Sequence, residues 1–472
     1  MAGAGFAGAA GVVVTWLAAR TLGAEQAGVF FAGTAAFVLA GGVAKLGTQT
    51  GLVYWLARLR AREQVHLLGA CLRIGLTPVA MAAVGLAAVL WFVAPAPLNW
   101  LALFLPVAAL SDAALAATRG YRRLRPTIRL ERVLRPALQL AAVAALAVAG
   151  VRSPLAYGLA WVAPYAPVAV LSGYALRRTH LSKIKASFTS LERHEGRLDH
   201  GCRTYRALRG AFWRFTGPRA VASVAQLALQ RVDVLLVASL GGLAAAAAYA
   251  VAGRFVVLGQ FANQGITHSV QPRLAEALAV DDRATANTLY QTATGWLVLV
   301  TWPLYLIVIT YAPVYLGLFG PGYRSGAPVV VVLASAMLVA NGCGMVDVVL
   351  SMAGRTRWNL ANVLLALTTM VALDLALIPH FGLVGAAVGL AAAVLVNNLL
   401  PLIQVGRYTG LHPFGAGTVA AGGLAVGCFG VLPHILAAIA GTGPAALLAT
   451  LLTALVSYGL GAYRLREALA LK

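Results

Sequence analysis

Long apolar stretches recur along the whole chain, separated by short polar segments. Stretches of 18 or more residues are long enough to cross the roughly 30 Å hydrocarbon core of a bilayer as α-helices. The pattern therefore predicts an all-α polytopic membrane protein with about fourteen transmembrane helices. The predicted spans are 2–19, 27–56, 68–94, 98–118, 133–150, 154–176, 212–239, 243–268, 288–312, 327–351, 358–378, 383–404, 415–437 and 443–463.

Basic residues are sorted between the loops that connect these spans. With the N-terminus inside, nearly all of them fall in cytoplasmic loops, and this asymmetry predicts that both termini are cytoplasmic. The fourth loop contributes Arg119, Arg122, Arg123, Arg125, Arg129, Arg132 and Arg135, whereas the opposite side has only Arg20, Arg152 and Arg324.

Composition agrees with this class: 60% of the residues are hydrophobic and only 11% are charged. The net charge of +22 would suggest nucleic acid as a partner of a soluble protein. Because the basic residues follow the predicted topology, no nucleic-acid role is expected. The four cysteines are scattered without a CxxC pair, so neither a disulfide framework nor a zinc site is implied. The first apolar segment, which lacks a basic leader, is interpreted as a spanning helix.

The chain also resembles itself at a nearly constant offset. LGAEQAGVF aligns with GGLAAAAAY at an offset of 219, which pairs Gly23 with Gly242 and Phe30 with Tyr249. LGTQTGLVYWLA aligns with NQGITHSVQPRLA at an offset of 218. We therefore predict two six-helix lobes related by a pseudo-twofold axis along the membrane normal, followed by two additional helices. The predicted limits are 1–176 for the first lobe, 177–209 for a basic linker, 210–410 for the second lobe, and 411–472 for the last two helices and the cytoplasmic tail.

The linker allows two interpretations. Leu181, Ile184, Phe188 and Leu191 recur at helical spacing beside lysines, which suits a short amphipathic helix on the inner leaflet. A solvated connection between the lobes fits equally well. A metal site formed by His194, His200 and Cys202 is disfavoured because their spacing matches no common pattern. We therefore expect no metal and no cofactor.

Charged residues inside the predicted spans are the most informative positions. Such residues normally face a bundle interior or a watery cavity, and they mark substrate or ion paths or else inter-helix pairs that serve assembly. Both interpretations remain open. The set is Lys45, Asp112, Arg231, Asp233, Arg254, Asp347 and Asp374.

Two neighbouring spans carry polar stripes at helical spacing. On a continuous helix Arg231 would lie roughly 160° from Asp233, so the two could not pair. The stripes predict a hydrated cavity, with Arg20 and Lys45 near it by the repeat and Asn397 in the twelfth span. The stripes are Arg219, Ser223, Gln226, Gln230 and Asp233 in the seventh span, and Tyr249, Gly253, Gln260, Gln264, Thr267 and Gln271 in the eighth.

Several segments together resemble a known family. AARTLGAEQAGVF, VDVLLVASLGGLAAAAAYAVAGRF followed by QPRLAE, LFGPGYRSGAPVVVVL and LIPHFGLVGAAVG are similar to segments of polysaccharide (O-antigen-type) flippases. These flippases belong to the multidrug/oligosaccharidyl-lipid/polysaccharide (MOP) exporter superfamily, which also includes MATE transporters and lipid II flippases. The resemblance covers most of residues 10–410. Two departures are Ala247, where glycine is usual, and Asp374, where asparagine is expected.

The resemblance implies an alternating-access flippase rather than an enzyme. It would move a polyprenyl-pyrophosphate-linked oligosaccharide from the inner to the outer leaflet for cell-envelope polysaccharide synthesis. The implied location is the bacterial inner membrane. The implied partners are the lipid-linked glycan, membrane lipids and glycan polymerase or ligase machinery. Alternatives are a lipid II flippase and a MATE-type cation-coupled drug antiporter. The short outer loops disfavour a glycan enzyme.

Candidate residues follow from the chemistry of that substrate. Basic side chains in a dry-walled cavity would compensate the pyrophosphate charge, and carboxylates would bind a coupling proton or sodium ion, or neutralise those cations. The membrane potential is a third possible driving force. Pyrophosphate candidates are Arg20, Lys45, Arg254 and Arg231, and coupling or cavity candidates are Asp233, Asp347, Asp374, Gln230, Gln260, Gln264 and Asn397.

Overall fold

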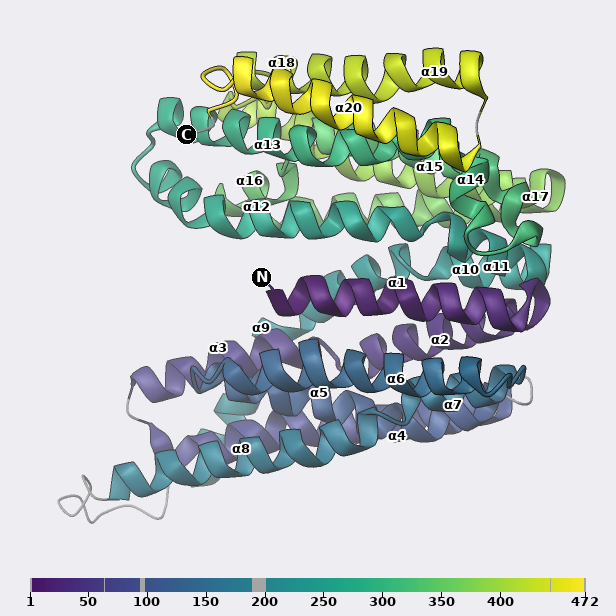
Figure 1. The fold of residues 1–472 in the computed structure, drawn as a ribbon. Coiled ribbons are helices and arrows are strands. Elements are labelled where there is room, and N and C mark those ends of the chain that lie inside the picture. The colour runs from purple at the N-terminus through teal and green to yellow at the C-terminus, as the bar shows by residue number, and fades with distance from the viewer. Residues whose placement is uncertain (1, 63, 94–97, 189–200, 442, 471–472) are drawn as a thin grey trace. The chain divides into compact units, whose positions relative to one another are not determined.

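The structure is a computed structural model that describes residues 2–62, 64–93, 98–188, 201–441 and 443–470. Within these ranges all regular secondary structure is helical (Figure 1). Eleven helices of the described chain are long and apolar enough to cross a membrane, or twelve if the bent pair Tyr205–Leu229 and Val232–Gly241 is one span. The predicted all-α polytopic fold is confirmed.

Each of the fourteen predicted spans falls on helix, and two features explain the lower count. The helix α17 (Thr356–Thr409) merges two predicted spans across Gly382, whose φ of 54° and ψ of −128° are not helical. The predicted span 133–150 corresponds to α6 (Arg135–Val148), which has only 14 residues and follows the charged π-helical turn η3 (Thr127–Leu134).

The helices divide into two compact units. Unit 1 comprises Met1–Leu22 and Val29–Val232, and unit 2 comprises Gly23–Gly28 and Asp233–Lys472. The further helices of unit 1 are α1 (Ala2–Leu22), α2 (Ala24–Ala44), α3 (Thr48–Ala61), η1 (Val65–Leu67), α4 (Leu68–Val93), η2 (Leu98–Phe104), α5 (Leu105–Gly120), α7 (Pro154–Val162), α8 (Tyr165–Phe188) and α9 (Gly201–Leu229).

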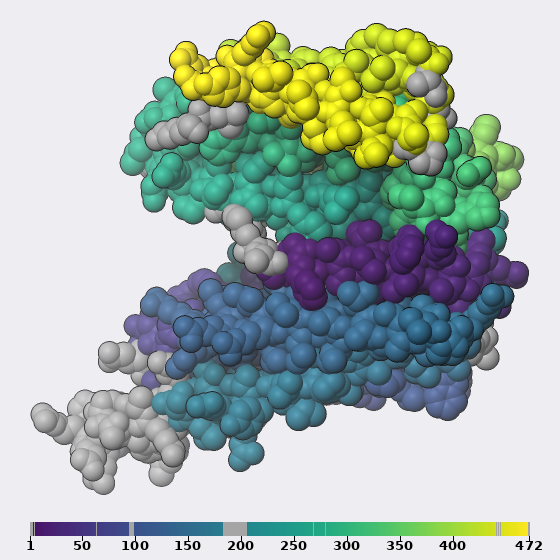
Figure 2. Space-filling view, viewed as in Figure 1, coloured from purple at the N-terminus to yellow at the C-terminus, as the bar shows by residue number. Residues whose placement is uncertain are grey.

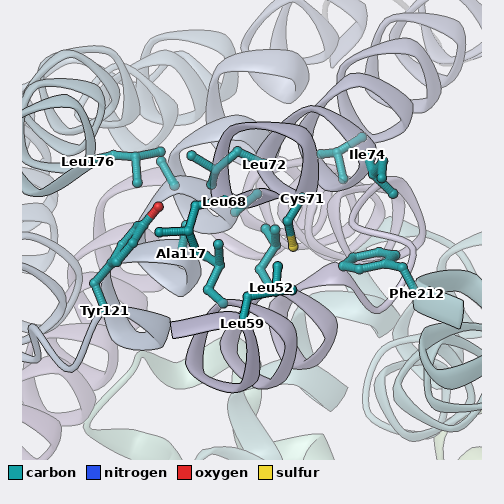
Figure 3. Close-up of a cluster of buried hydrophobic side chains, with 14 of the residues drawn as sticks. Leu52, Leu59, Leu68, Cys71, Leu72, Ile74, Ala117, Tyr121, Leu176 and Phe212 are labelled. Carbon is teal, nitrogen blue, oxygen red and sulfur yellow. The ribbon is translucent and has the colours of Figure 1, made fainter. Parts of the chain in front are cut away.

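An apolar cluster holds α3, α4, α5, α8 and α9 together in unit 1. Figure 3 shows Leu52 and Leu59 of α3 facing Leu68, Leu72 and Cys71 of α4. Phe212 of α9 belongs to the same cluster and is fully buried. By its packing α9 therefore lies in unit 1. The boundary between the two compact units falls where the helix bends, between Val232 and Asp233. The lobe limits 1–176, 177–209 and 210–410 stay predictions.

Unit 2 contains the remaining helices. α13 is its central element and contacts α12, α15 and α18. Its N-terminus is capped by Asp282, which accepts a hydrogen bond from the backbone N–H of Thr285 at 3.0 Å, and this bond lowers the pKa of Asp282. The elements are α10 (Val232–Leu236), η4 (Val237–Gly241), α11 (Leu243–Ala252), α12 (Arg254–Ala279), α13 (Arg283–Thr310), α14 (Ala312–Gly317), η5 (Pro321–Gly326), α15 (Ala327–Gly342), α16 (Val346–Met352), α18 (Ala416–Ala425), η6 (Val426–Val431), α19 (Leu432–Ala440) and α20 (Pro444–Arg464), besides α17.

The last helices form a layer against α13. Figure 2 shows the yellow C-terminal helices over the green body of unit 2. The segment after α20 folds back onto this layer, where Leu469 is buried and its carbonyl accepts a 3.0 Å hydrogen bond from Trp296 Nε1. The two additional helices are thus an integral part of unit 2.

Two glycines of the sequence repeat have a matching backbone. Gly23, between α1 and α2, has a φ of 77°, and Gly242, at the start of α11, has a φ of 89°. These left-handed values favour glycine, because a Cβ would be strained there. The offset of 219 therefore pairs two helix starts of the same kind.

The beginning of the predicted linker is an extension of a membrane helix. α8 continues without a break from Tyr165 to Phe188, so Leu181 and Ile184 belong to it. Leu191, His194 and His200 lie outside the described residues, and the amphipathic-helix and metal-site alternatives that depend on them stay untested.

Candidate functional site

Four of the charged positions singled out from the sequence lie where helices are interrupted. Lys45 lies between α2 and α3, and Arg231 lies between α9 and α10. Arg254 begins α12 directly after α11 ends, and Asp347 lies in the first turn of α16. Interrupted helices expose backbone N–H and C=O groups, which transporters use at binding sites within the membrane. Periodicity alone did not reveal these interruptions.

The bend between α9 and α10 divides the polar stripe of the seventh span. The two segments meet at 51°, and Gln230 and Arg231 between them are not helical. Arg219, Ser223 and Gln226 are exposed on α9 and Gln230 is exposed in the bend, whereas Asp233 is buried in unit 2. The angle of 160° between Arg231 and Asp233 assumed a continuous helix and is therefore wrong.

Asp233 is held by hydrogen bonds at the start of α10. Its Oδ2 accepts a 3.0 Å hydrogen bond from the hydroxyl of Tyr249 in α11, and its Oδ1 accepts one of 2.7 Å from the backbone N–H of Val234. Tyr249 is buried and does not share the exposed face of Gln260 and Gln264, because the helix breaks at Gly253. Tyr249 was predicted to lie on the stripe of the eighth span. It lies instead beside Asp233.

Asp374 of α17 lies close to this pair. It interacts electrostatically with both Asp233 and Tyr249, and it is completely buried. Among the described residues, none donates a hydrogen bond to either of its carboxylate oxygens. A buried carboxylate without donors is costly by several kcal/mol as a bare charge, so this position suits a bound proton or cation.

The geometry of α17 creates the space for Asp374. The helix turns at Gly382, and its second arm packs against the first through small residues. Gly385 lies against the carbonyl of Leu377, and Gly389 lies directly against Oδ1 of Asp374. A side chain at position 389 would overlap the carboxylate. Asp374 thus lies between the arms of one helix and beside Asp233.

The Asp233–Tyr249–Asp374 cluster offers two carboxylates and one phenol. The carboxylate of Asp374, which accepts no hydrogen bond from the described residues, is disfavoured as a bare charge in a dry setting, and a bound proton or cation would relieve this cost. The described part of the chain contains no group of three or more His, Cys, Asp or Glu side chains that could hold a metal ion.

Unit 1 has a different charged cluster, centred on Asp112 of α5. Lys45 Nζ lies 3.0 Å from Asp112 Oδ2, and Arg135 Nη1 lies 3.6 Å from Oδ1. Arg135 also stacks over the ring of Tyr165 at 4.9 Å. Nearby, Arg119 pairs with Glu131 at 3.9 Å. Because one carboxylate serves two cations, the group at Asp112 retains one net positive charge.

Four further candidate residues lie on α1, α12, α16 and α17. Arg20 of α1 stacks on Trp16 at 5.8 Å, and Arg254 lies near Tyr315. Asp347 is exposed, and its backbone carbonyl accepts a hydrogen bond of 2.7 Å from Asn359. Asn397 is half-buried in α17. Arg20, Lys45 and Arg231 belong to unit 1, and Arg254 belongs to unit 2.

Sequence reasoning missed three contributors. Arg135 was counted as a loop residue, although it pairs with Asp112. Tyr249 was assigned to a polar stripe and not to the carboxylate it binds. No sequence pattern identified Gly389, because its contact with the carboxylate of Asp374 depends on the fold of α17.

Comparisons with known proteins agree with this architecture. Residues 218–375, which include Asp233, Tyr249 and Asp374, match the MatE family model. A structure described as the lipid II flippase MurJ in an inward closed conformation matches with a TM-score of 0.71 over 98% of both chains, at 11% identity. An inward-facing multidrug resistance MATE transporter of the MOP superfamily matches with a TM-score of 0.63 over 86% of this chain and 94% of its own, at 13% identity.

The chain has the MOP-superfamily fold. The predicted resemblance to this superfamily is confirmed at that level. No curated protein sequence is significantly similar to the chain. The structural match to MurJ covers 98% of this chain, so it includes the two predicted C-terminal helices. The protein is a multi-pass membrane protein with this fold.

Proposed function

We propose that this protein is a flippase that moves a polyprenyl-diphosphate-linked saccharide from the inner to the outer leaflet by alternating access. It would be located in the inner membrane, with both termini in the cytoplasm. The proposal covers oligosaccharide carriers and lipid II alike, since both have a saccharide, a diphosphate and a polyprenyl tail. It makes the protein a transporter and not an enzyme.

One observation carries this proposal: the structural match to the lipid II flippase extends over 98% of both chains, including α18–α20. The match to the MATE transporter covers 86% of this chain. The net positive charge of the Lys45–Asp112–Arg135 cluster supports an anionic substrate. Anionic diphosphate is the group hardest to move through lipid, and basic side chains would compensate it.

The Asp233–Tyr249–Asp374 cluster supports coupling to a cation gradient. Asp374 is buried without a hydrogen-bond donor among the described residues, so a proton or sodium ion would stabilise it. Binding of that ion in unit 2 would bias the protein towards the conformation that holds it best. Arg20, Arg231, Arg254, Asp347, Gln230, Gln260, Gln264 and Asn397 remain candidates for lining the substrate path.

The MatE match to residues 218–375 favours a second candidate, a cation-coupled drug antiporter. A cavity for cationic drugs would need acidic residues in excess, whereas unit 1 has an excess of cations at Asp112.

The test is translocation in proteoliposomes. A labelled polyprenyl-diphosphate disaccharide is incorporated into both leaflets, and an impermeant glycosidase added outside reports the outer pool. The proposal expects complete accessibility at a rate that depends on the protein, with no uptake of ethidium. Ethidium transport without saccharide movement would assign the protein to the drug antiporters.

A further inference from the structure

The place where α3 and α9 pack together in unit 1 has an exposed aromatic and basic cluster. The two helices approach closely because Gly47 and Gly51, spaced as in GxxxG, lie against Ala220 and Thr216. This contact brings Tyr54 of α3 over Phe215 of α9, with ring centroids 4.0 Å apart and planes inclined by only 16°. Glycine packing thus builds a two-ring stack on the surface of unit 1.

Each ring of this stack holds an arginine. The guanidinium of Arg219 lies 3.9 Å from the centroid of Phe215. Arg58 lies 5.8 Å from Tyr54 and 5.4 Å from Trp55, and it donates a 2.6 Å hydrogen bond to the Tyr54 hydroxyl. Stacking uses the face of a guanidinium and leaves most of its N–H edge for other acceptors. We call Arg58, Tyr54, Phe215 and Arg219 the arginine stack.

The positive charge of the arginine stack is not offset by acidic groups. Within the described parts of the chain, no carboxylate forms an ion pair with Arg58 or Arg219. Lys45 and Arg135 differ in this respect, since they share Asp112. Arg58 lies in the last turn of α3, at the end of the apolar stretch Ala24–Ala61, and Arg219 lies in the segment Tyr205–Leu229, which is apolar enough to cross a membrane together with Val232–Gly241. Holding two cations there has a cost, which a bound anion would offset.

Neighbouring polar groups extend the arginine stack along α9. Ser223 and Gln226 are exposed on the same polar stripe of α9 as Arg219. Hydroxyl and amide groups at helical spacing suit the hydroxyls of a sugar, whereas guanidinium edges suit phosphate oxygens bidentately. The surface therefore offers an anion-binding end followed by a sugar-compatible strip.

We infer that the arginine stack is a binding subsite for the diphosphate of a lipid-linked saccharide, with Arg58 and Arg219 as its ligands and Tyr54 and Phe215 as positioning residues. This inference rests on the proposed function and names residues for its substrate head group. It adds Arg58 and Arg219 to the candidate diphosphate ligands; from the sequence, Arg219 was expected on the polar stripe of the seventh span and Arg58 was not singled out.

Binding of undecaprenyl diphosphate to the full chain in neutral-lipid nanodiscs, compared with undecaprenol, tests the inference. Wild type is expected to prefer the diphosphate. Arg58→Gln and Arg219→Gln should each weaken its binding by about tenfold, the effect of losing a charge-assisted hydrogen bond, and leave undecaprenol binding unchanged. Tyr54→Leu and Phe215→Leu should weaken it too, although both arginines remain. Matched controls are Arg62→Gln and Arg214→Gln, which remove exposed arginines outside the stack.

The alternatives give different results. If Arg214→Gln weakens binding as much as Arg219→Gln, general charge and not the arginine stack is responsible, and the inference is wrong. Equal competition by phosphatidylglycerol would assign the stack to membrane phospholipid and also overturn it. If wild type prefers the diphosphate but the stack variants bind normally, only this inference fails. A wild type without any preference contradicts the proposed function itself. Arg219→Lys, which keeps the charge, and thermal melting of each variant separate lost binding from lost folding.

Discussion

Gly389 lies directly against the carboxylate of Asp374, across the turn that Gly382 makes in α17. This contact is possible only without a side chain at position 389. We predict that Gly389→Ala displaces Asp374 and strongly reduces transport, because overpacking a buried site forces about 1–3 kcal/mol of rearrangement. The matched control is Gly406→Ala on the same helix, where a Cβ would meet nothing within 4 Å. Equal transport by the two variants would show that the contact is unimportant.

Asp374 should be dispensable for folding but required for coupling. Asp374→Asn keeps the shape of the side chain and removes the need for a proton or cation, so its melting temperature should equal or exceed that of wild type. Its transport should no longer respond to sodium or proton gradients. The measurement is the initial rate in proteoliposomes with each gradient imposed separately. A variant that still responds to both gradients as wild type does would exclude Asp374 as the coupling site.

Tyr249 should stabilise unit 2 through Asp233. Tyr249→Phe removes one hydrogen bond of 3.0 Å to a buried carboxylate, which typically lowers the free energy of unfolding by about 1.5–3 kcal/mol. Denaturation in detergent micelles gives this difference. Tyr463→Phe, on an exposed tyrosine, serves as the control and should have no effect. A Tyr249→Phe variant as stable as its control would mean that the phenol does not support Asp233.

Lys45 and Asp112 should be energetically coupled. Their ion pair of 3.0 Å is partly shielded, with side-chain exposures of 23% and 14%. We predict a coupling energy of about 1 kcal/mol in a double-mutant cycle of Lys45→Gln and Asp112→Asn. Asp112→Asn alone should be the more damaging single change, because it leaves Lys45 and Arg135 without their shared carboxylate. Strictly additive effects would indicate that the pair contributes nothing in the membrane.

The sequence was sufficient to predict the helical architecture, since apolar length alone determines which segments can cross a membrane. It was also sufficient to single out Lys45, Asp112, Asp233 and Asp374, because charge is rare in such segments. Both clusters of the structure contain residues from that set. Their pairing was not predictable: Asp233 and Asp374 are 141 positions apart, and no periodicity relates different helices.

Interruptions of the helices are the main reason why some side-chain positions were predicted incorrectly. A regular 100° advance per residue placed Asp233 and Tyr249 on exposed stripes, but the bend at Gln230–Arg231 and the break at Gly253 redirect both into the interior of unit 2. A single glycine or a short polar pair can occur in a continuous helix or at a break. Tertiary packing determines which of these forms, and the sequence pattern does not show it.

The measurement that tests the central claim most directly is the translocation of a labelled polyprenyl-diphosphate disaccharide by the purified protein in proteoliposomes. Wild type should expose the inner-leaflet pool to an external glycosidase, and an imposed sodium or proton gradient should accelerate this exposure. Asp374→Asn should abolish that acceleration. A folded wild-type protein that leaves the inner pool protected under every gradient would contradict the account.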